Sequence, residues 1–330
     1  MNNFRKILTE HGAGERTALS IQQRLAECAR SKHWAIGALT LLLVAWAGLR
    51  MPIAGAAEYP TKLIRLIVPF TPGGPADILG RVLGQGLAER LGQQVLIDNR
   101  SGAGGTVAAG IAARAAPDGY TLFQCNIASN AIAASLYAKL PYEPLRDFAP
   151  ITRIGTTTSA LIVHPAMPVS SVAEFIAHAK ANPGKVSYGS SGAGSSPHLA
   201  MELFKTMTGI DIVHIAYKGA APALADLIGG QVAIGISNIP ALLSPVQTGR
   251  ARALAVTSAQ RVSQLPSVPT MSESGLPGYE VTSWYGVCAP AGTPAPVLDK
   301  LHSGLRGYAS SRTSAFSTLM SNTARIVVVT

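Results

Sequence analysis

The segment from residue 63 to residue 91 combines an apolar run, a glycine turn and a helical pattern. Branched residues between 63 and 68 predict a buried strand, and Thr71-Pro-Gly-Gly74 predicts the turn that ends it. Pro75 suits the first position of a helix, and apolar residues recur at helical spacing from Ile78 to Leu91. The start of such a helix presents unpaired backbone N–H groups and partial positive charge, which suit a carboxylate or a phosphate. An ordinary strand–helix turn without a ligand is the alternative.

A second unit of the same design begins at residue 186. Val186-Ser-Tyr188 predicts a strand, the Gly/Ser-rich residues 189–196 a turn, and residues 198–207 a helix, with Pro197 at its first position. Strands and helices alternate along most of the chain, so we expect an α/β fold with a mostly parallel sheet. Two such turns that face each other would form a cleft beyond the carboxyl ends of the strands.

Three local expectations follow from turn and capping chemistry. Thr106 is expected to cap a helix over residues 107–116. Residues 237–240 are expected to form a turn between strands at 232–236 and 253–256. Gly74 is expected to need the backbone freedom and close approach that glycine permits.

The first 57 residues have the organisation of an export signal. The apolar run from Trp34 to Leu49 is short for a membrane span but suits the apolar region of a signal peptide. Small residues follow it at Ala54-Gly55-Ala56, as expected for a cleavage site. We therefore expect a long signal peptide over residues 1–57 and export to the periplasm. An uncleaved N-terminal anchor is the alternative.

Charge and cysteine content narrow the function classes. The formal net charge is +10, but charged residues make up only 13% and no basic run is interleaved with aromatics, so we expect no nucleic-acid partner. A mild positive field favours anionic ligands. Cys125 and Cys288 lie beyond the signal segment, and we expect buried free thiols on neighbouring strands. An exported protein also permits a disulfide between them.

None of the candidate motifs for catalysis or cofactor binding has the residue spacing that its chemistry requires. The Gly189-Ser-Ser-Gly-Ala193 sequence misses the last glycine of a nucleophile elbow, so a catalytic serine is not expected. Gly102-Ala-Gly-Gly-Thr-Val107 misses the last glycine of a dinucleotide fingerprint. The histidines show no metal-ligand spacing. We therefore expect no catalytic residue, no cofactor and no metal.

Four side chains near the two turns have both a ligand-binding and a structural interpretation. Asp77 could bond a ligand amine or water, or it could stabilise the first turn of its helix through the dipole. His198 could donate to a carboxylate or pack on its helix, and Tyr217 could line a cleft or only pack. Asn238 could bond the ligand or close its own turn.

The chain resembles the tripartite tricarboxylate transporter substrate-binding proteins, the Bug or TctC-like extracytoplasmic solute receptors. The similarity rests on Val68-Pro-Phe-Thr-Pro-Gly-Gly74, on Tyr188-Gly-Ser-Ser-Gly-Ala-Gly-Ser-Ser-Pro-His198 and on further stretches in the same order. These stretches are residues 59–77, 99–105, 117–121, 188–198, 217–226, 266–275 and 284–294. The resemblance covers roughly residues 58–301.

The resemblance implies a two-lobed periplasmic-binding-protein (Venus flytrap) fold with a ligand cleft between the lobes. It implies a first lobe over residues 58–156 and 282–330, a second lobe over 157–281, and chain crossings near residues 156 and 282. It also implies a monomer that holds a small organic carboxylate, mainly through backbone N–H groups and ordered water, for a membrane permease. A ligand-presenting sensor and, less favoured, an exported enzyme acting on carboxylates are the alternatives.

The ligand class that the resemblance implies is a di- or tricarboxylate, an amino acid or an aromatic acid. The expected ligand-binding residues come from the two turns and from loops beside them. They are Thr71, Gly73, Gly74, Ala76, Asp77, Ser129, Ser190, Ser191, Ser195, Ser196, His198, Tyr217, Gly219 and Asn238.

Two features depart from the family pattern. Ala233 stands where family members usually carry an acid. Residues 302–330 contain no acidic residue, which indicates a truncation or a shifted reading frame and predicts a first lobe without its closing helix.

Overall fold

The computed structural model describes residues 58–311, with the side chains of residues 307–311 left out. The predicted signal peptide over residues 1–57 and the C-terminal residues 312–330 lie outside this described part. Within it, no helix is both long enough and apolar enough to cross a membrane.

The first lobe is built on a mixed sheet in the strand order β2-β1-β3-β9-β4. These strands are β1 (Ile64–Val68), β2 (Val95–Asn99), β3 (Thr121–Phe123), β4 (Phe148–Val163) and β9 (Thr282–Pro290). The strand β1 pairs in parallel with β2 and β3, whereas β9 is antiparallel to β3 and β4. Our prediction of a mostly parallel sheet is therefore wrong. The strands β4 and β9 pass between the lobes in opposite directions, and no helical crossover joins them.

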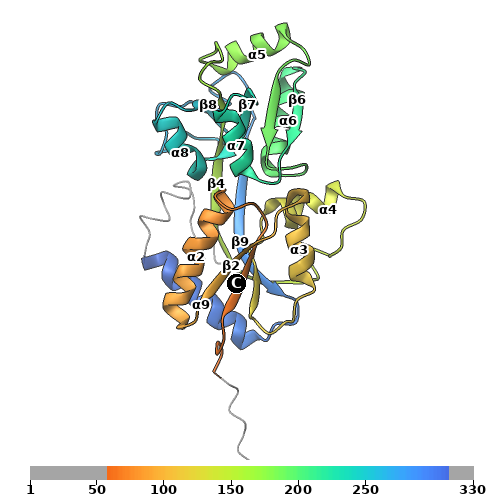
Figure 1. The fold of residues 1–330 in the computed structure, drawn as a ribbon, viewed down its shortest axis with the longest axis vertical. Coiled ribbons are helices and arrows are strands. Elements are labelled where there is room, and N and C mark those ends of the chain that lie inside the picture. Colours follow the sequence, from red (N-terminus) through yellow and green to blue (C-terminus); the bar gives the residue numbers. More distant parts are fainter. Residues whose placement is uncertain (1–57, 312–330) are drawn as a thin grey trace, which may run out of the picture. The chain divides into compact units, whose positions relative to one another are not determined.

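Helices cover both faces of this sheet. They are α2 (Pro75–Leu91), α3 (Thr106–Ala113) and α9 (Ala295–Ser311), while the short α4 (Ala133–Leu136) lies in the connection between β3 and β4. Leu66 faces α2 and α9 and is buried with Leu83 and Leu301. Its neighbour Ile67 faces the other side and is buried with Ala108 of α3, as the alternation of a strand requires. The helix α9 packs against α2 (Figure 1). The expectation of a missing closing helix concerns the chain after residue 301, most of which lies outside the described part, so it stays a prediction.

The second lobe shares β4 with the first. From Ser159 to Val163 this strand pairs with β7 (Ile234–Asn238) and with β8 (Arg252–Val256), both antiparallel. Beyond β7 lie β5 (Ser187–Ser190) and β6 (Val213–Ala216), all three parallel. The helices are α5 (Val172–Ala181), α6 (Ser196–Thr208), α7 (Ala220–Ile228) and α8 (Ile239–Gln247). Since β4 pairs with β9 up to Thr158, the chain passes between the lobes along these two strands (Figure 1).

The two predicted strand–turn–helix units are confirmed, but their details differ. The helix α2 begins at Pro75 with Gly74 as its N-cap, whereas α6 begins at Ser196 and places Pro197 second. Thr106 is not a cap: Gly105 takes that position, and the Thr106 hydroxyl donates to the carbonyl of Ala103. The expected turn at 237–240 instead starts α8, which tolerates one proline near its start and another near its end.

Cys125 and Cys288 form a disulfide, so our expectation of two free thiols is wrong. The expectation of neighbouring strands is confirmed: Cys288 pairs with Phe123 at the end of β3, two residues before Cys125. This pairing holds the two Cα atoms 6.0 Å apart, within the range that a disulfide spans. The bond links segments 163 residues apart.

Candidate functional site

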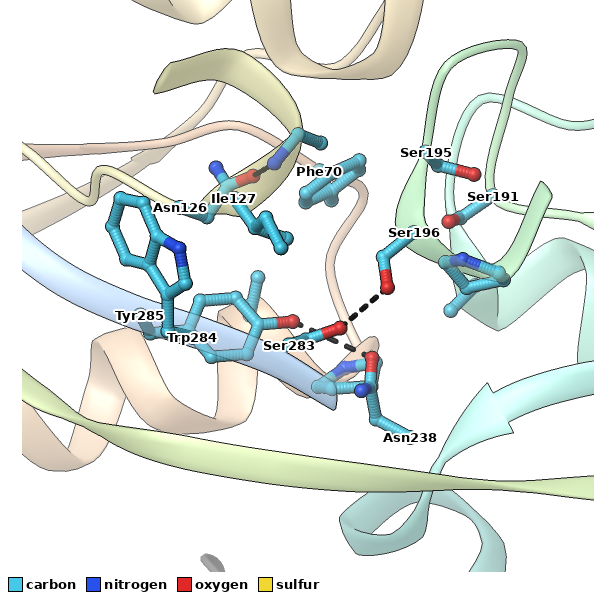
Figure 2. A pocket seen from close by; sticks show the side chains of 15 residues that line it. Phe70, Asn126, Ile127, Ser191, Ser195, Ser196, Asn238, Ser283, Trp284 and Tyr285 are labelled. Atoms are coloured by element: carbon cyan, nitrogen blue, oxygen red, sulfur yellow. Dashed lines mark hydrogen bonds between the residues drawn. The ribbon is translucent and has the colours of Figure 1, made fainter. Parts of the chain in front are cut away.

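A small cavity lies where the two predicted turns approach each other. From the first lobe and β9, it is lined by Phe70, Pro75, Ala76, Asn126, Ile127, Ala128, Ser283, Trp284 and Tyr285. From the second lobe, it is lined by Ser191, Ser195, Ser196, Pro197, Ala220 and Asn238. Figure 2 shows Phe70, Ile127 and Trp284 on one side and the serine hydroxyl groups on the other. The cavity is therefore aromatic and apolar on one wall and hydroxylic on the opposite wall.

The cavity brings together part of the predicted site. Ala76, Ser191, Ser195, Ser196 and Asn238 line it, whereas nine predicted residues do not. Those nine are Thr71, Gly73, Gly74, Asp77, Ser129, Ser190, His198, Tyr217 and Gly219. They lie outside the lining, where they bond to the turns, to other groups of their own lobe or to the opposite lobe.

The turn before α2 is held by Asp77 and by a left-handed glycine. Gly73 has φ +78°, while Gly74 has φ −83°, so Gly73 rather than Gly74 needs the conformational freedom of glycine. Asp77 Oδ2 accepts from the Gly73 N–H at 2.9 Å and from Arg81 Nε at 2.9 Å. Burial acts to raise the pKa of Asp77, but the hydrogen bonds from Arg81 and Gly73 outweigh it and hold that pKa below its ordinary value. Asp77 therefore fixes its own turn as a carboxylate.

Replacing Asp77 with asparagine should lower the free energy of unfolding by about 1–2 kcal/mol at neutral pH. An asparagine oxygen can still accept from the Gly73 N–H, so we expect this loss mainly from the missing charge that strengthens that bond; the ion pair with Arg81, which is largely exposed, is screened and adds little. A depressed pKa adds stability above the ordinary pKa, about 4, and that stability is lost as the pH falls through the folded value. Urea unfolding of both proteins at neutral pH and below about pH 4 should show the difference shrink; a constant difference would contradict a role as a carboxylate.

The turn before α6 is held by side chains of the second lobe. The N-cap Ser195 accepts from the backbone N–H of His198 at 3.4 Å. The Ser190 hydroxyl accepts from the Gly192 N–H at 3.1 Å and lies 2.6 Å from His214 Nε2. His198 Nδ1 accepts from the Gly194 N–H at 3.2 Å, so this ring bonds to its own loop.

Asn238, Tyr217 and Ser129 bond to groups of the protein. Asn238 Nδ2 donates to Ser159 Oγ at 3.2 Å, and its Oδ1 accepts from Tyr285 Oη at 3.5 Å. The Tyr217 hydroxyl donates to Asp226 at 2.6 Å, within the second lobe. Ser129 accepts from Asn126 Nδ2 at 3.1 Å. Asn238 thus lines the cavity with its amide already bonded, while Tyr217 and Ser129 support their own lobes.

The lobes touch on more than one side of the cavity. The hydroxyl groups of Ser196 and Ser283 are 2.6 Å apart, and Figure 2 shows this bond across the cavity edge. Tyr137 donates to the carbonyl of Ala193 at 3.3 Å. Gly219 lies against Thr71 so closely that an added Cβ would be 2.1 Å from Thr71 Oγ1 and 3.0 Å from Thr71 N. These contacts describe lobes that are closed on each other.

Sequence reasoning missed ten lining residues, and most had a usable signal. Phe70, Pro75, Pro197 and Ala220 directly adjoin the predicted turns, so extending each turn by one residue would have found them. Asn126, Ile127 and Ala128 follow β3, where the carboxyl end of a strand reaches the same edge. Ser283, Trp284 and Tyr285 come from β9, and no local pattern marks them as site residues.

Comparison with known proteins decides the family. The family model described as tripartite tricarboxylate transporter family receptor (TctC) matches residues 79–328. The chain belongs to this family. Its members are solute-binding receptors rather than enzymes, which implies an extracytoplasmic location. The match continues to residue 328, past residue 301 where we expected the resemblance to end.

Similar proteins agree with this assignment. The receptor is 41% identical over 258 residues to the protein BugT of Bordetella pertussis (strain Tohama I), which covers 78% of this chain and 79% of BugT. The solved structure of Rpa4515 of R. palustris with adipate is 41% identical, with a TM-score of 0.76 over 78% of this chain and 86% of that one. MatC of Rhodopseudomonas palustris with bound malate is 31% identical, with a TM-score of 0.75 over 79% and 88%. The two-lobed periplasmic-binding-protein fold predicted from the sequence is confirmed.

Proposed function

We propose that this receptor captures a small organic carboxylate in the cavity between its lobes and delivers it to the membrane permease of a tripartite tricarboxylate-type transporter. The observation that carries the proposal is that two helices from opposite lobes start at one cavity: Ala76 in the first turn of α2, and Ser196 and Pro197 in the first turn of α6. First-turn N–H groups lack intrahelical partners and favour an anion. Ser191, Ser195 and Asn238 add polar groups to the same cavity.

The remaining nine predicted residues have a supporting role in this proposal. Thr71 and Gly219 close the lobes on each other, and Asp77 with Gly73 shapes the turn of the first lobe. Ser190 and His198 bond to the turn of the second lobe. Backbone N–H groups and ordered water are proposed to hold the carboxylate.

The lining also favours one kind of acid. Among the described residues that line the cavity, none carries a charged side chain, while Phe70, Ile127 and Trp284 form an apolar wall. A second buried charge would have no oppositely charged side chain there, and an unpaired buried charge is costly. Within the carboxylate class, the cavity therefore favours an acid with an apolar body.

Location, boundaries and partners complete the proposal. We place the mature receptor in the periplasm as a monomer, with the signal peptide over residues 1–57 removed. We set the lobes at residues 58–156 with 282–330 and at 157–281, which is supported by the change of partner of β4 after Thr158 and the start of β9 at Thr282. We propose a permease partner rather than a sensor kinase, which is supported by the transporter family that the chain matches.

Calorimetric titration of the purified protein with pairs of acids and their primary amides tests this function. Benzoate against benzamide and adipate against adipamide differ in charge but little in shape. We expect at least one acid to bind at micromolar or lower Kd and its amide to bind at least about 100-fold more weakly, because the amide lacks the charge that the helix starts favour. Equal binding of acid and amide, or release of a reaction product from the acid, would refute the proposal.

A further inference from the structure

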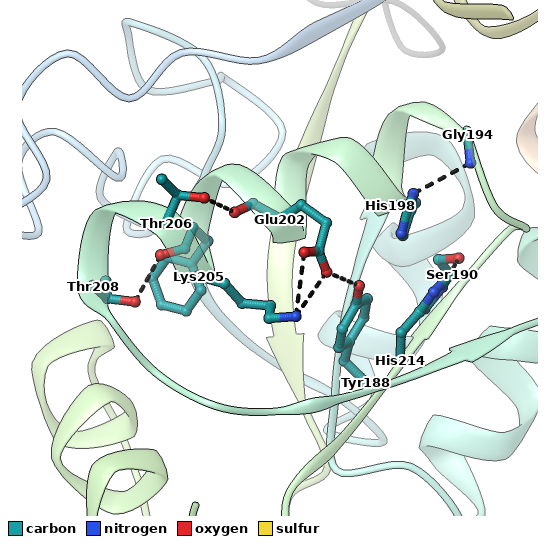
Figure 3. Close-up of polar contacts among 10 residues, drawn as sticks. Tyr188, Ser190, Gly194, His198, Glu202, Lys205, Thr206, Thr208 and His214 are labelled. Carbon is teal, nitrogen blue, oxygen red and sulfur yellow. Dashed lines mark hydrogen bonds and ion pairs between the residues drawn. The ribbon is translucent and has the colours of Figure 1, made fainter. Parts of the chain in front are cut away.

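A stack of three rings lies behind the second turn, inside the second lobe. The rings of His198 and His214 are 4.2 Å apart at an angle of 23°, and the ring of Tyr188 stacks on His214 at 4.7 Å. The three come from α6, β6 and β5, so the stack joins three elements of the lobe (Figure 3). Tyr188 is fully buried and donates its hydroxyl to Glu202 at 2.5 Å. The stack is therefore fixed at its inner end.

Both histidines hold the loop that carries the hydroxylic wall of the cavity. His198 Nδ1 accepts from the Gly194 N–H at 3.2 Å, and His214 Nε2 lies 2.6 Å from Ser190 Oγ. Ser190 in turn bonds to the Gly192 N–H at 3.1 Å. Figure 3 shows the two rings side by side, with Gly194 at one and Ser190 at the other. Between these anchors stands Ser191, and directly after them Ser195, both lining the cavity.

We propose that His198 and His214, in their uncharged forms, are positioning residues that clamp the 190–195 loop in its ligand-binding conformation and release it on acidification. The inference rests on the proposed function, since it assumes that the cavity binds a carboxylate. A ring nitrogen accepts a hydrogen bond only without a proton. Protonation of His198 at Nδ1 thus replaces the bond to Gly194 with two opposed N–H groups. A second charge on His214, 4.2 Å away, adds repulsion.

The surroundings of the rings favour the uncharged state. Burial lowers the pKa of His198, with Lys205 in the same sense and Glu202 opposing. Burial, His198 and Lys205 lower the pKa of His214 to about 4, again against Glu202. The other titratable groups at the stack are Tyr188 and, beside Gly194, Tyr137. Glu202 is itself bonded to Lys205 at 3.0 Å, which offsets its charge.

The sign of the pH effect separates this clamp from simpler roles. Both pKa values lie below the ordinary histidine value, about 6.5, so the folded loop is favoured above that pH and is lost as the pH falls toward the folded values. A clamp therefore predicts that affinity for an anion decreases on acidification. A histidine acting only through its charge predicts the reverse, because imidazolium attracts an anion, and a purely packing role predicts no change.

Nuclear magnetic resonance of the ligand-free protein tests the clamp without any ligand. The His198 ring should carry its proton on Nε2 at about pH 7.5, leaving Nδ1 as the acceptor. The Gly194 amide resonance should shift with the titration of His198, and its exchange with solvent should accelerate as the ring is protonated. A Gly194 amide whose resonance and solvent exchange do not change as His198 titrates would overturn the proposal, whether or not an acid binds.

Three variants test the clamp through its effect on binding, with benzoate, which carries one charge on an apolar body, as the probe. His198→Asn keeps an acceptor near the Nδ1 position but does not titrate, so its Kd should stay within about threefold of wild type at pH 7.5. His198→Ala leaves Gly194 without its partner and should bind about tenfold more weakly at the same pH. His178→Asn, on α5 of the same lobe, is the matched control and should keep the wild-type pH profile.

The ratio of the wild-type Kd to the His198→Asn Kd isolates the pH effect of the protein, because protonation of benzoate changes both Kd values alike. This ratio should rise several-fold between about pH 7.5 and pH 5. A constant ratio, with all variants folded by circular dichroism, contradicts the clamp but leaves the proposed function intact. Failure of every tested acid to bind instead contradicts the proposed function, and the resonance experiment then decides the clamp alone.

Discussion

Replacing Gly219 with alanine is expected to weaken carboxylate binding about 10- to 100-fold while both lobes remain folded. Gly219 has φ 172° and ψ 174°, an extended conformation that alanine adopts without strain. The added Cβ would meet Thr71 Oγ1 at 2.1 Å and the Thr71 backbone nitrogen at 3.0 Å. Thr71 belongs to the opposite lobe, so the overlap arises only when the lobes close. Overpacking costs about 1–3 kcal/mol, and about 1.4 kcal/mol corresponds to a tenfold change in Kd.

Gly74→Ala provides a matched comparison for this variant. Gly74 is also an N-cap in extended conformation, and it also faces the opposite lobe, next to Ala220 and Ala221. Its added Cβ would come no closer than 3.4 Å to any atom, which is ordinary contact. We expect a change in Kd of at most about threefold, from the weaker capping by alanine. Equal losses in the two variants, measured by calorimetry, would show that closure does not bring Gly219 against Thr71.

Removing the disulfide with the double variant Cys125→Ala/Cys288→Ala should lower the free energy of unfolding by about 3–5 kcal/mol. The bond closes a loop of 163 residues, and chain entropy makes the stabilisation larger for longer loops. Each kcal/mol shifts the Tm of a chain this long by about 2–4 °C, so the decrease should be on the order of 10 °C. Differential scanning calorimetry of both proteins under oxidising conditions gives the comparison.

The wild-type protein under reducing conditions is the control for that variant. Its Tm should approach the Tm of the double variant, while the double variant should not respond to the reductant. Thiol labelling of the denatured, unreduced protein should find neither Cys125 nor Cys288 reactive. Two labelled thiols, or a Tm that is insensitive to reductant, would contradict the bond between β3 and β9.

The sequence patterns correctly predicted those elements of the fold that depend mainly on neighbouring residues in the chain. The apolar run before Thr71 and the proline at Pro75 place β1 and α2 to within a residue. The helix α8 escaped prediction because Pro240 and Pro245 both normally argue against a helix, and here each stands near an end. The antiparallel direction of β9 was not predicted either, since the direction of a strand in a sheet depends on which distant strand it pairs with.

The residues of the candidate site also divide into those that local sequence patterns could predict and those that they could not. Ser195 and Ser196 could be predicted because they stand between a strand and a helix, where a cap is expected. Trp284 and Ser283 could not, because they lie inside a strand, near its start, and reach the cavity only through the path of β9 between the lobes. The disulfide follows the same logic: its two cysteines become neighbours only through the pairing of β9 with β3.

A crystal structure of the protein with its tightest-binding acid tests the central claim most directly. The claim is that the starts of α2 and α6 hold the carboxylate from opposite lobes. We expect the carboxylate in the cavity beside Ala76 and Ser196, within hydrogen-bond distance of first-turn N–H groups or of waters bound to them. A carboxylate paired instead with Arg153, in the wider groove along β4 and β9, would contradict the account.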